Sequence, residues 1–177
     1  MNYIKILVAL CLVFTLNMGE TKAQDPGFTQ FYANQLFLNP AFAGSQRCPR
    51  IGINYRNQWP AISAVYTTYS LAYDQYVSGL GGGIGLLVVQ DNAADVLTST
   101  RASFIYSKHL PINKQYSINF GFEGTFAQFA LNTSELNWPD QIDPNFGFTG
   151  VTQEVIGNSN VTYPDFSAGM LLYSKRF

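Results

Sequence analysis

Charged residues are scarce in this chain of 177 residues, where they make up 12% of the sequence and leave a net charge of −1. Soluble globular domains usually carry about a quarter charged residues. The sequence also has no run of basic residues, and so lacks the electrostatic footprint of a nucleic-acid-binding protein. A surface that faces lipid explains the shortage of charge directly, and we expect no nucleic acid among the partners.

Cysteine and histidine are nearly absent as well, with two cysteines and one histidine in the whole chain. Cys11 lies in an apolar run near the N-terminus, so the loss of that run would leave Cys48 without an intramolecular disulfide partner. No cluster of His, Cys, Asp and Glu has the spacing of a metal site. His109 falls in an expected turn, where nothing local supports a Ser-His-Asp arrangement. We therefore expect no enzymatic activity and no cofactor.

The N-terminus has the three parts of a secretory signal peptide. Lys5 supplies a positive charge, residues 6–16 are almost entirely apolar, and Thr-Lys-Ala at 21–23 places small residues at positions −3 and −1 of a cleavage site. The apolar run is shorter than the roughly 18 residues that a membrane-spanning helix needs. We expect residues 1–23 to be removed during export and residues 24–49 to form a periplasmic or plug-like segment.

Beyond residue 49, apolar and polar side chains alternate, as in β-strands with one apolar face. In residues 116–127, for example, Phe120 and Phe122 fall on one face, whereas Gly121 and Glu123 fall on the other. Strands that cross a bilayer need about 9–11 residues, whereas strands of globular proteins usually have about five or six. The alternation predicts six strands, at residues 50–58, 65–76, 82–90, 98–108, 116–128 and 163–174.

The connections between these strands differ in length. Short turns are expected at residues 77–81 and 109–115, and longer loops at 57–64, 91–97 and 129–162. Outer-membrane barrels have short periplasmic turns and long external loops. We therefore predict an all-β fold, an antiparallel transmembrane β-barrel over residues 50–177. Because single-chain barrels have at least about eight strands, six indicate an incomplete barrel. The chain is then the N-terminal part of a longer protein, or one of several chains that close one barrel.

The polar faces of the predicted strands are rich in Gly, Ser, Thr and Asn. Leu87 and Val89 depart from this pattern, because they fall on the glycine-bearing face of their strand. A soluble β-sandwich also alternates, but the low charge and the long strands favour the barrel. Four charged residues on the polar faces are candidates to pair across a lumen: Arg56, Asp74, Arg101 and Glu123.

Three parts of the chain are more specific than generic strand sequence. The first comprises Gln-Asp-Pro-Gly-Phe-Thr-Gln-Phe-Tyr-Ala-Asn at 24–34 and Leu-Asn-Pro-Ala-Phe-Ala-Gly at 38–44. The others are Tyr-Arg-Asn-Gln-Trp-Pro at 55–60 and Tyr-Pro-Asp-Phe-Ser-Ala-Gly at 163–169. In these motifs the chain resembles the PorP/SprF family, outer-membrane proteins of the type IX secretion and gliding systems of Bacteroidetes. The resemblance covers the mature chain and the first half or so of a usual family member.

This resemblance implies a non-enzymatic barrel in the outer membrane that works with the type IX machinery. The implied partners are outer-membrane lipid, secretion components such as a periplasmic peptidoglycan-binding lipoprotein, and an exported adhesin whose export or surface attachment the barrel supports. Three alternatives remain open: a general porin or transporter, a secreted soluble β-sandwich that binds glycans or surfaces, and an outer-membrane hydrolase.

Two segments are candidates for partner binding. In the first, the candidates are Asn39, Pro40, Phe42 and Gly44, which either contact a partner or belong to a plug-like element inside the barrel. Alternatively, Pro40 and Gly44 are turn residues that only set the entry of the chain into the first strand. In the long loop at 129–162, the candidate anchors for an exported partner are Trp138, Phe146 and Phe148. Packing within the loop explains these three aromatic residues equally well.

Overall fold

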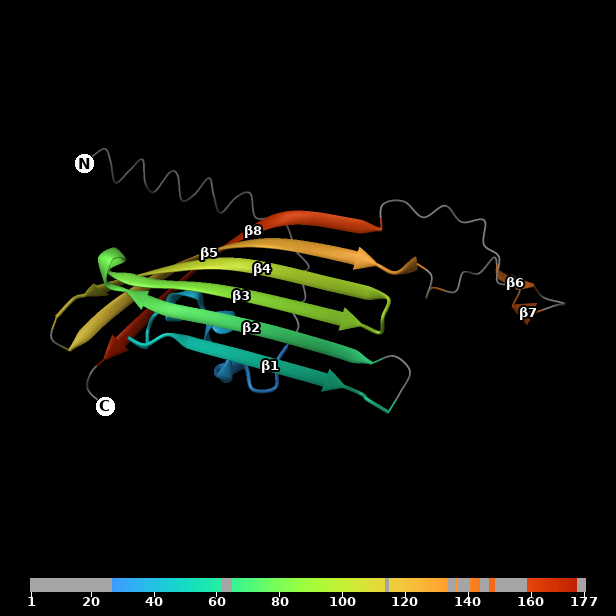
Figure 1. The fold of residues 1–177 in the computed structure, drawn as a ribbon, viewed down its shortest axis with the longest axis horizontal. Helices are drawn as coiled ribbons and strands as arrows, with labels where there is room; N and C mark the ends of the chain where they lie inside the picture. Colours follow the sequence, from blue (N-terminus) through green and yellow to red (C-terminus); the bar gives the residue numbers. More distant parts are fainter. Residues whose placement is uncertain are drawn as a thin grey trace, which may run out of the picture.

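Six long antiparallel strands form one open sheet in the computed structural model, which describes residues 27–61, 65–113, 115–133, 136, 141–143, 147–148 and 159–174. The strands are β1 (Arg50–Gln58), β2 (Tyr66–Val77), β3 (Gly82–Ala93), β4 (Leu97–Pro111), β5 (Tyr116–Leu131) and β8 (Asn160–Ser174). They lie in the order β1-β2-β3-β4-β5-β8, so each strand pairs with its neighbour in sequence among these six (Figure 1). The predicted all-β antiparallel fold is confirmed, and the open sheet is consistent with part of a barrel wall.

Four of the six strands, β3, β4, β5 and β8, are longer than the alternation predicted, whereas β1 and β2 have the predicted lengths. The connection between β3 and β4 was expected to be a loop at residues 91–97, but β3 continues to Ala93 and β4 begins at Leu97. Ala94 and Asp95 adopt positive φ angles of 56° and 58°, which turn the chain sharply. The Asn92 side chain supports this turn, because its Oδ1 accepts the backbone N–H of Asp95 at 3.0 Å. The interpretation of residues 91–97 as a loop was wrong, because residues 91–93 pair with β4 and extend the hydrogen-bonded ladder between β3 and β4.

His109 also lies within a strand and not in the expected turn. β4 runs through Pro111, and His109 pairs with Asn119 of β5. At the other end of β5, the strand extends to Leu131, and β8 begins at Asn160. Between them, β6 (Ile142–Asp143) and β7 (Gly147–Phe148) form a small two-stranded sheet of their own.

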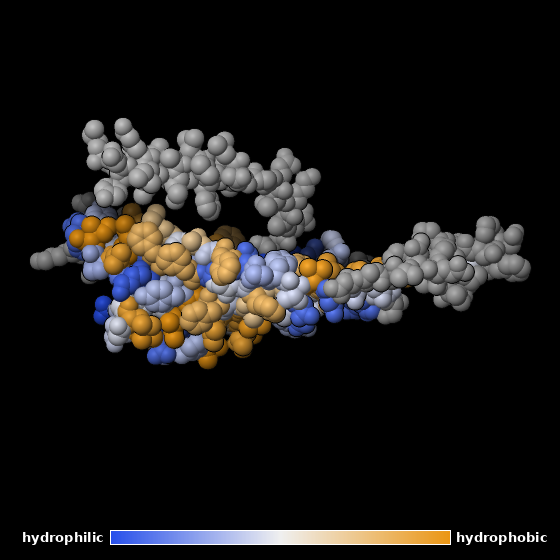
Figure 2. Space-filling model, turned by 90° about the horizontal axis from the view of Figure 1, so that it is seen from above, coloured by the Kyte–Doolittle hydropathy of each residue, from blue (hydrophilic) through white to orange (hydrophobic). Residues whose placement is uncertain are grey.

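The two faces of the six-stranded sheet differ sharply. One face, which we call the apolar face, exposes large aromatic and aliphatic side chains from every strand, including Ile53, Leu71, Leu86, Phe104, Phe122 and Phe166. Phe122 is 60% exposed and Phe166 is 80% exposed. Figure 2 shows, from one side, apolar side chains exposed on the described part of the molecule among polar ones. The opposite face, which we call the polar face, carries small and polar residues such as Ser70, Asp74 and Ser107, and these are buried.

Burial of the polar face is due to the N-terminal segment, residues 27–49, which lies across it (Figure 1). This segment contains three single turns, η1 (Phe31–Ala33), α2 (Gln35–Leu38) and η2 (Pro40–Phe42). The side chain of Asn34 accepts the N–H of Phe37 at the start of α2, and Asn39 accepts that of Ala41 at the start of η2. Asparagine is a preferred N-cap residue, so these two residues end one turn and begin the next.

A remaining short turn, η3 (Ser78–Leu80), joins β2 to β3 and ends at Gly81 in the left-handed conformation. No helix in the described part of the chain combines the length and the hydropathy that a membrane-spanning helix needs.

Candidate functional site

The N-terminal segment crosses the sheet along a row of small residues. Gly83 of β3 pairs with Ser107 of β4, Ser107 pairs with Gly121 of β5, and Gly121 pairs with Gly169 of β8. The segment from Asn39 to Gly44 lies over this row, with six residues across four strands. The row is therefore a shallow track on the polar face into which a backbone fits.

Glycine is required along this track because the approach is between backbones. A Cβ atom added at Gly83 would overlap with the carbonyl group of Ala43, and one at Gly121 would overlap with the Pro40–Ala41 peptide. At Gly169, an added Cβ would meet the side chain of Asn39. Any larger side chain in these places would lift the segment off the sheet.

Side chains of the strands satisfy the polar backbone groups of the segment. The hydroxyl of Ser107 donates to the carbonyl of Ala41 at 3.2 Å, and Nε2 of His109 donates to the carbonyl of Ala43 at 3.1 Å. Asn39 in turn donates through Nδ2 to the carbonyl of Met170 at 3.4 Å. Buried backbone groups need such partners, so the segment is docked by a specific set of hydrogen bonds.

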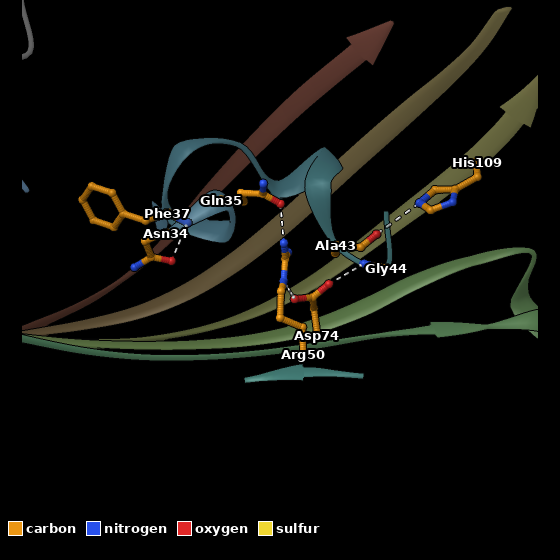
Figure 3. Close-up of polar contacts among 8 residues, drawn as sticks. All are labelled: Asn34, Gln35, Phe37, Ala43, Gly44, Arg50, Asp74 and His109. Atoms are coloured by element: carbon orange, nitrogen blue, oxygen red, sulfur yellow. Dashed lines mark hydrogen bonds and ion pairs between the residues drawn. The ribbon is translucent and has the colours of Figure 1, made fainter. Parts of the chain in front are cut away.

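Asp74 is the electrostatic centre of the docked segment, with a residue exposure of only 1%. One carboxylate oxygen accepts the backbone N–H of Gly44 at 2.9 Å, and the other accepts Nε of Arg50 at 2.8 Å. Arg50 also donates through Nη1 to the side chain of Gln35 in α2 (Figure 3). A buried carboxylate needs a positive partner and hydrogen bonds. Arg50, the first residue of β1, supplies the positive charge, and Gly44 of the N-terminal segment supplies a backbone N–H.

Apolar contacts hold the first half of the segment. Leu36 of α2 is 2% exposed and forms a buried cluster with Ala43, Ala72, Leu87, Val89 and Ile105. A Cβ at Gly85 would lie only 3.2 Å from Leu36, so this glycine opens the space that the leucine fills. Leu87 and Val89, which disturb the alternation of β3, are thus the apolar floor under Leu36.

The four candidates in the Asn39–Gly44 motif have different surroundings. Asn39, Pro40 and Gly44 all lie against the strands, and Gly44 has a φ of 64° that favours glycine. Phe42 is half-buried, and its backbone N–H donates to the carbonyl of Asn39 at 3.1 Å within η2. These contacts are all with the chain itself.

The candidates in the long loop lie largely outside the described residues. Trp138 and Phe146 are both outside them. Phe148 belongs to β7, but its side chain is not described.

The four candidate lumen charges all lie on the polar face. Asp74 pairs with Arg50, its direct neighbour across β1 and β2. Arg56 donates to Gln58 on its own strand at 2.7 Å. Glu123 accepts hydroxyl groups from Ser167 at 2.8 Å and Thr125 at 3.3 Å. Arg101 and Glu123 line a common cavity of about 310 Å³ beside Pro40.

Sequence reasoning missed Arg50, Ser107 and the contact made by His109. Their roles depend on which residues face one another across strands, which no local pattern states. A usable signal was present for the track itself, because Gly83, Gly121 and Gly169 recur on the polar faces of three strands. In the described part of the chain, no three His, Cys, Asp or Glu residues gather as a metal site would require.

Comparison with protein families gives a match. A family model described as type IX secretion system membrane protein PorP/SprF matches residues 20–177. No curated protein and no solved structure matches the chain.

Proposed function

The chain belongs to the PorP/SprF family of type IX secretion system membrane proteins, and from this membership we propose that it is a non-enzymatic β-barrel component of that machinery in the outer membrane. In this proposal, residues 1–23 direct export, and residues 24–49 contain a plug-like element. The barrel wall supports the export or the surface attachment of partner proteins. The proposed contacts are with a periplasmic peptidoglycan-binding lipoprotein on one side and an exported adhesin on the other.

The apolar face carries this proposal. All six long strands expose large aromatic or aliphatic side chains on it, in an arrangement that lipid would cover and water would not favour. The strands also have the length that a tilted crossing of the bilayer requires. We assign the end of the sheet that carries residues 78–81 and 112–115 to the periplasm, because residues 59–65 and 132–159 form the two longest connections at the opposite end.

The edges of the sheet extend the proposal. β1 and β8 are the two edge strands, and unpaired backbone edges do not occur in contact with hydrocarbon. The barrel that we propose therefore includes strands beyond these six, supplied by the same polypeptide or by another.

The docked segment favours a closed barrel over the alternative of a general porin. The Asn39–Gly44 motif and α2 occupy the face that would line the lumen. We expect planar bilayers containing the full-length protein to show low conductance. Replacement of residues 34–44 by a Gly/Ser linker of equal length should raise the conductance, since the linker cannot make the same contacts. Large conductance of the unaltered protein would favour the porin.

Fractionation of cells that produce the full-length protein tests the proposed location. The protein should be found in the outer-membrane fraction and should migrate faster on gels when it is not heated, as folded barrels do. Recovery in the soluble periplasmic or extracellular fraction would instead support the β-sandwich.

Deletion of the gene tests the role. Export or surface attachment of type IX cargo should be lost and then restored by the wild-type gene, with a cytoplasmic protein as the control for lysis. Unchanged cargo secretion and surface display in the deletion strain would contradict the proposed role.

A further inference from the structure

A second cavity lies at the end of the sheet that carries the short turns. Its volume is about 430 Å³, and its walls come from the ends of β2, β4, β5 and β8 together with the last part of the N-terminal segment. Residues that matter for its chemistry are Ser45, Arg47, Tyr76, His109, Tyr116 and Tyr173. This volume is within the usual range of ligand sites, roughly 300–1,000 Å³.

The cavity has a positive charge without a negative one. Arg47 is among its described lining residues, and none of them is Asp or Glu. The cavity beside Pro40 differs, because it contains Arg101 together with Glu123 and Asp165. An acidic group is therefore the ligand that the charge of the second cavity suits.

Arg47 is positioned to bind such a group. Its guanidinium lies over the ring of Tyr76, 6.0 Å from the ring centre, and Tyr76 packs in turn against His109 with ring centres 5.5 Å apart. Within the described residues, Arg47 makes no hydrogen bond or ion pair. The N–H groups of such an arginine are available for a bidentate contact with a carboxylate.

His109 and Tyr173 join the cavity to the docked segment. His109 donates to the carbonyl of Ala43, and Tyr173 lines the cavity together with Ser45 of the segment. An occupant of the cavity would therefore touch the segment just after Gly44. Both side chains are on the polar face, so a lipid headgroup at the apolar face cannot reach this site.

We propose that this cavity binds a carboxylate-bearing, extended segment of a periplasmic protein, with Arg47 as the residue that recognises the carboxylate. Tyrosine and arginine are the residue types that most often anchor protein partners, and the cavity combines three tyrosines with an arginine. The amide side chains of Asn113, Gln115 and Asn119 add donors and acceptors that suit a peptide backbone. The assignment of the partner to the periplasm depends on the orientation given in the proposed function.

Peptide binding to the purified full-length protein in lipid nanodiscs tests this proposal. The probe is a fluorescein-labelled Ser-Glu-Tyr-Glu-Ser peptide, compared with Ser-Gln-Tyr-Gln-Ser. We expect the Glu peptide to bind at least tenfold more tightly than the Gln peptide, and Arg47→Gln to abolish that preference. Arg56→Gln is the matched control, because Arg56 is on the same face but does not line the cavity. It should leave both affinities unchanged.

Equal affinities for the two peptides, or an unchanged preference in Arg47→Gln, would overturn the proposal. Displacement of the Glu peptide by inorganic phosphate at equal concentration would also overturn it, since the site would then be a small-anion site. Heat-modifiable mobility of each variant checks that it is folded. The binding assay is independent of the fractionation experiment. If the protein is found in the outer membrane but shows no preference for the Glu peptide, the peptide site is refuted and the proposed function is not.

Discussion

At the scale of single residues, docking of the N-terminal segment depends on glycines in the strands, because they have no Cβ atom to separate the two backbones. Gly121 lies directly under the Pro40–Ala41 peptide, whereas Gly124 of the same strand faces the opposite side and has Phe166 at 3.7 Å from an added Cβ. The first contact is with backbone and the second is an ordinary van der Waals distance. The two glycines of β5 therefore have different tolerance for a methyl group.

We expect Gly121→Ala to weaken docking of the segment by about 1–3 kcal/mol, the usual effect of overpacking. Hydrogen exchange in residues 39–44 of the full-length protein should become roughly tenfold faster, which corresponds to about 1.4 kcal/mol. Gly124→Ala is the control and should leave exchange in this segment unchanged. Equal exchange in the two variants would contradict the backbone contact at Gly121.

The carboxylate of Asp74 gives a second test at this scale. Asp74→Asn retains an oxygen that can accept the N–H of Gly44 but removes the ion pair with Arg50. Because hydrogen bonds to charged groups contribute roughly 1.5–3 kcal/mol, we expect a loss of that order in the free energy of unfolding. Urea unfolding in lipid vesicles measures this loss.

Asp165→Asn is the matched control for Asp74→Asn. Asp165 is an exposed carboxylate on the same face whose Oδ1 accepts the neighbouring N–H of Phe166. Its substitution should change the unfolding free energy by less than about 0.5 kcal/mol. Similar losses in both variants would show that the Asp74–Arg50 pair has no special role.

At the scale of elements, the N-terminal segment is held by the sheet more than by its own structure. The four-residue helix α2 is too short to be stable alone, because isolated helices need roughly 12–15 residues in water. Burial of Leu36 fixes α2, because this side chain packs between the strands and Ala43 of the segment. The segment and the polar face therefore form one packed unit.

Leu36→Ala should release α2 from the sheet. Leucine-to-alanine changes in a packed core reduce stability by about 2–5 kcal/mol. Here the space left by the missing side-chain atoms would lie between the segment and the sheet. Limited proteolysis within residues 34–44 should become faster in the full-length protein. Leu38→Ala is the control, because Leu38 is 49% exposed, and cleavage of that variant should remain at the wild-type rate.

At the scale of the whole molecule, the two faces of the sheet have different surroundings. The polar face is partly covered by the N-terminal segment, whereas the apolar face is covered by nothing in the described part of the protein. In water such a face would promote association. In a bilayer it is the expected outer surface of a barrel.

Two arginine substitutions distinguish these environments. Phe104 lies near the middle of β4 and is 57% exposed, and Leu110 is an exposed residue near the end of the same strand. In a membrane, Phe104→Arg should reduce stability by about 2–4 kcal/mol, and Leu110→Arg by roughly 0–1 kcal/mol, because the effect depends on depth. Urea unfolding of the full-length protein in vesicles gives both values. Nearly equal, small effects would indicate that water covers this face.

The same contrast of scales separates what the sequence predicts from what it does not. The positions and the antiparallel arrangement of the six strands follow from alternation, which is a local property with a period of two residues. Strand ends were less accurate, since the polar residues at 91–93 serve equally well in a loop or in a ladder. Asp74 was placed on the correct face, but its partner Arg50 depends on the register of β1 against β2.

The motif Asn39–Gly44 shows this division most clearly. From the sequence alone, its proline and glycine predict a turn, and its resemblance to a family indicates that it is specific. Only the tertiary structure brings Ala41 against Ser107, 66 positions away, and sets Gly83, Gly121 and Gly169 in one row beneath it. Chain chemistry determines which face of each strand is apolar, because side-chain alternation is local. The docking track exists only after strand register has aligned residues that are distant in sequence.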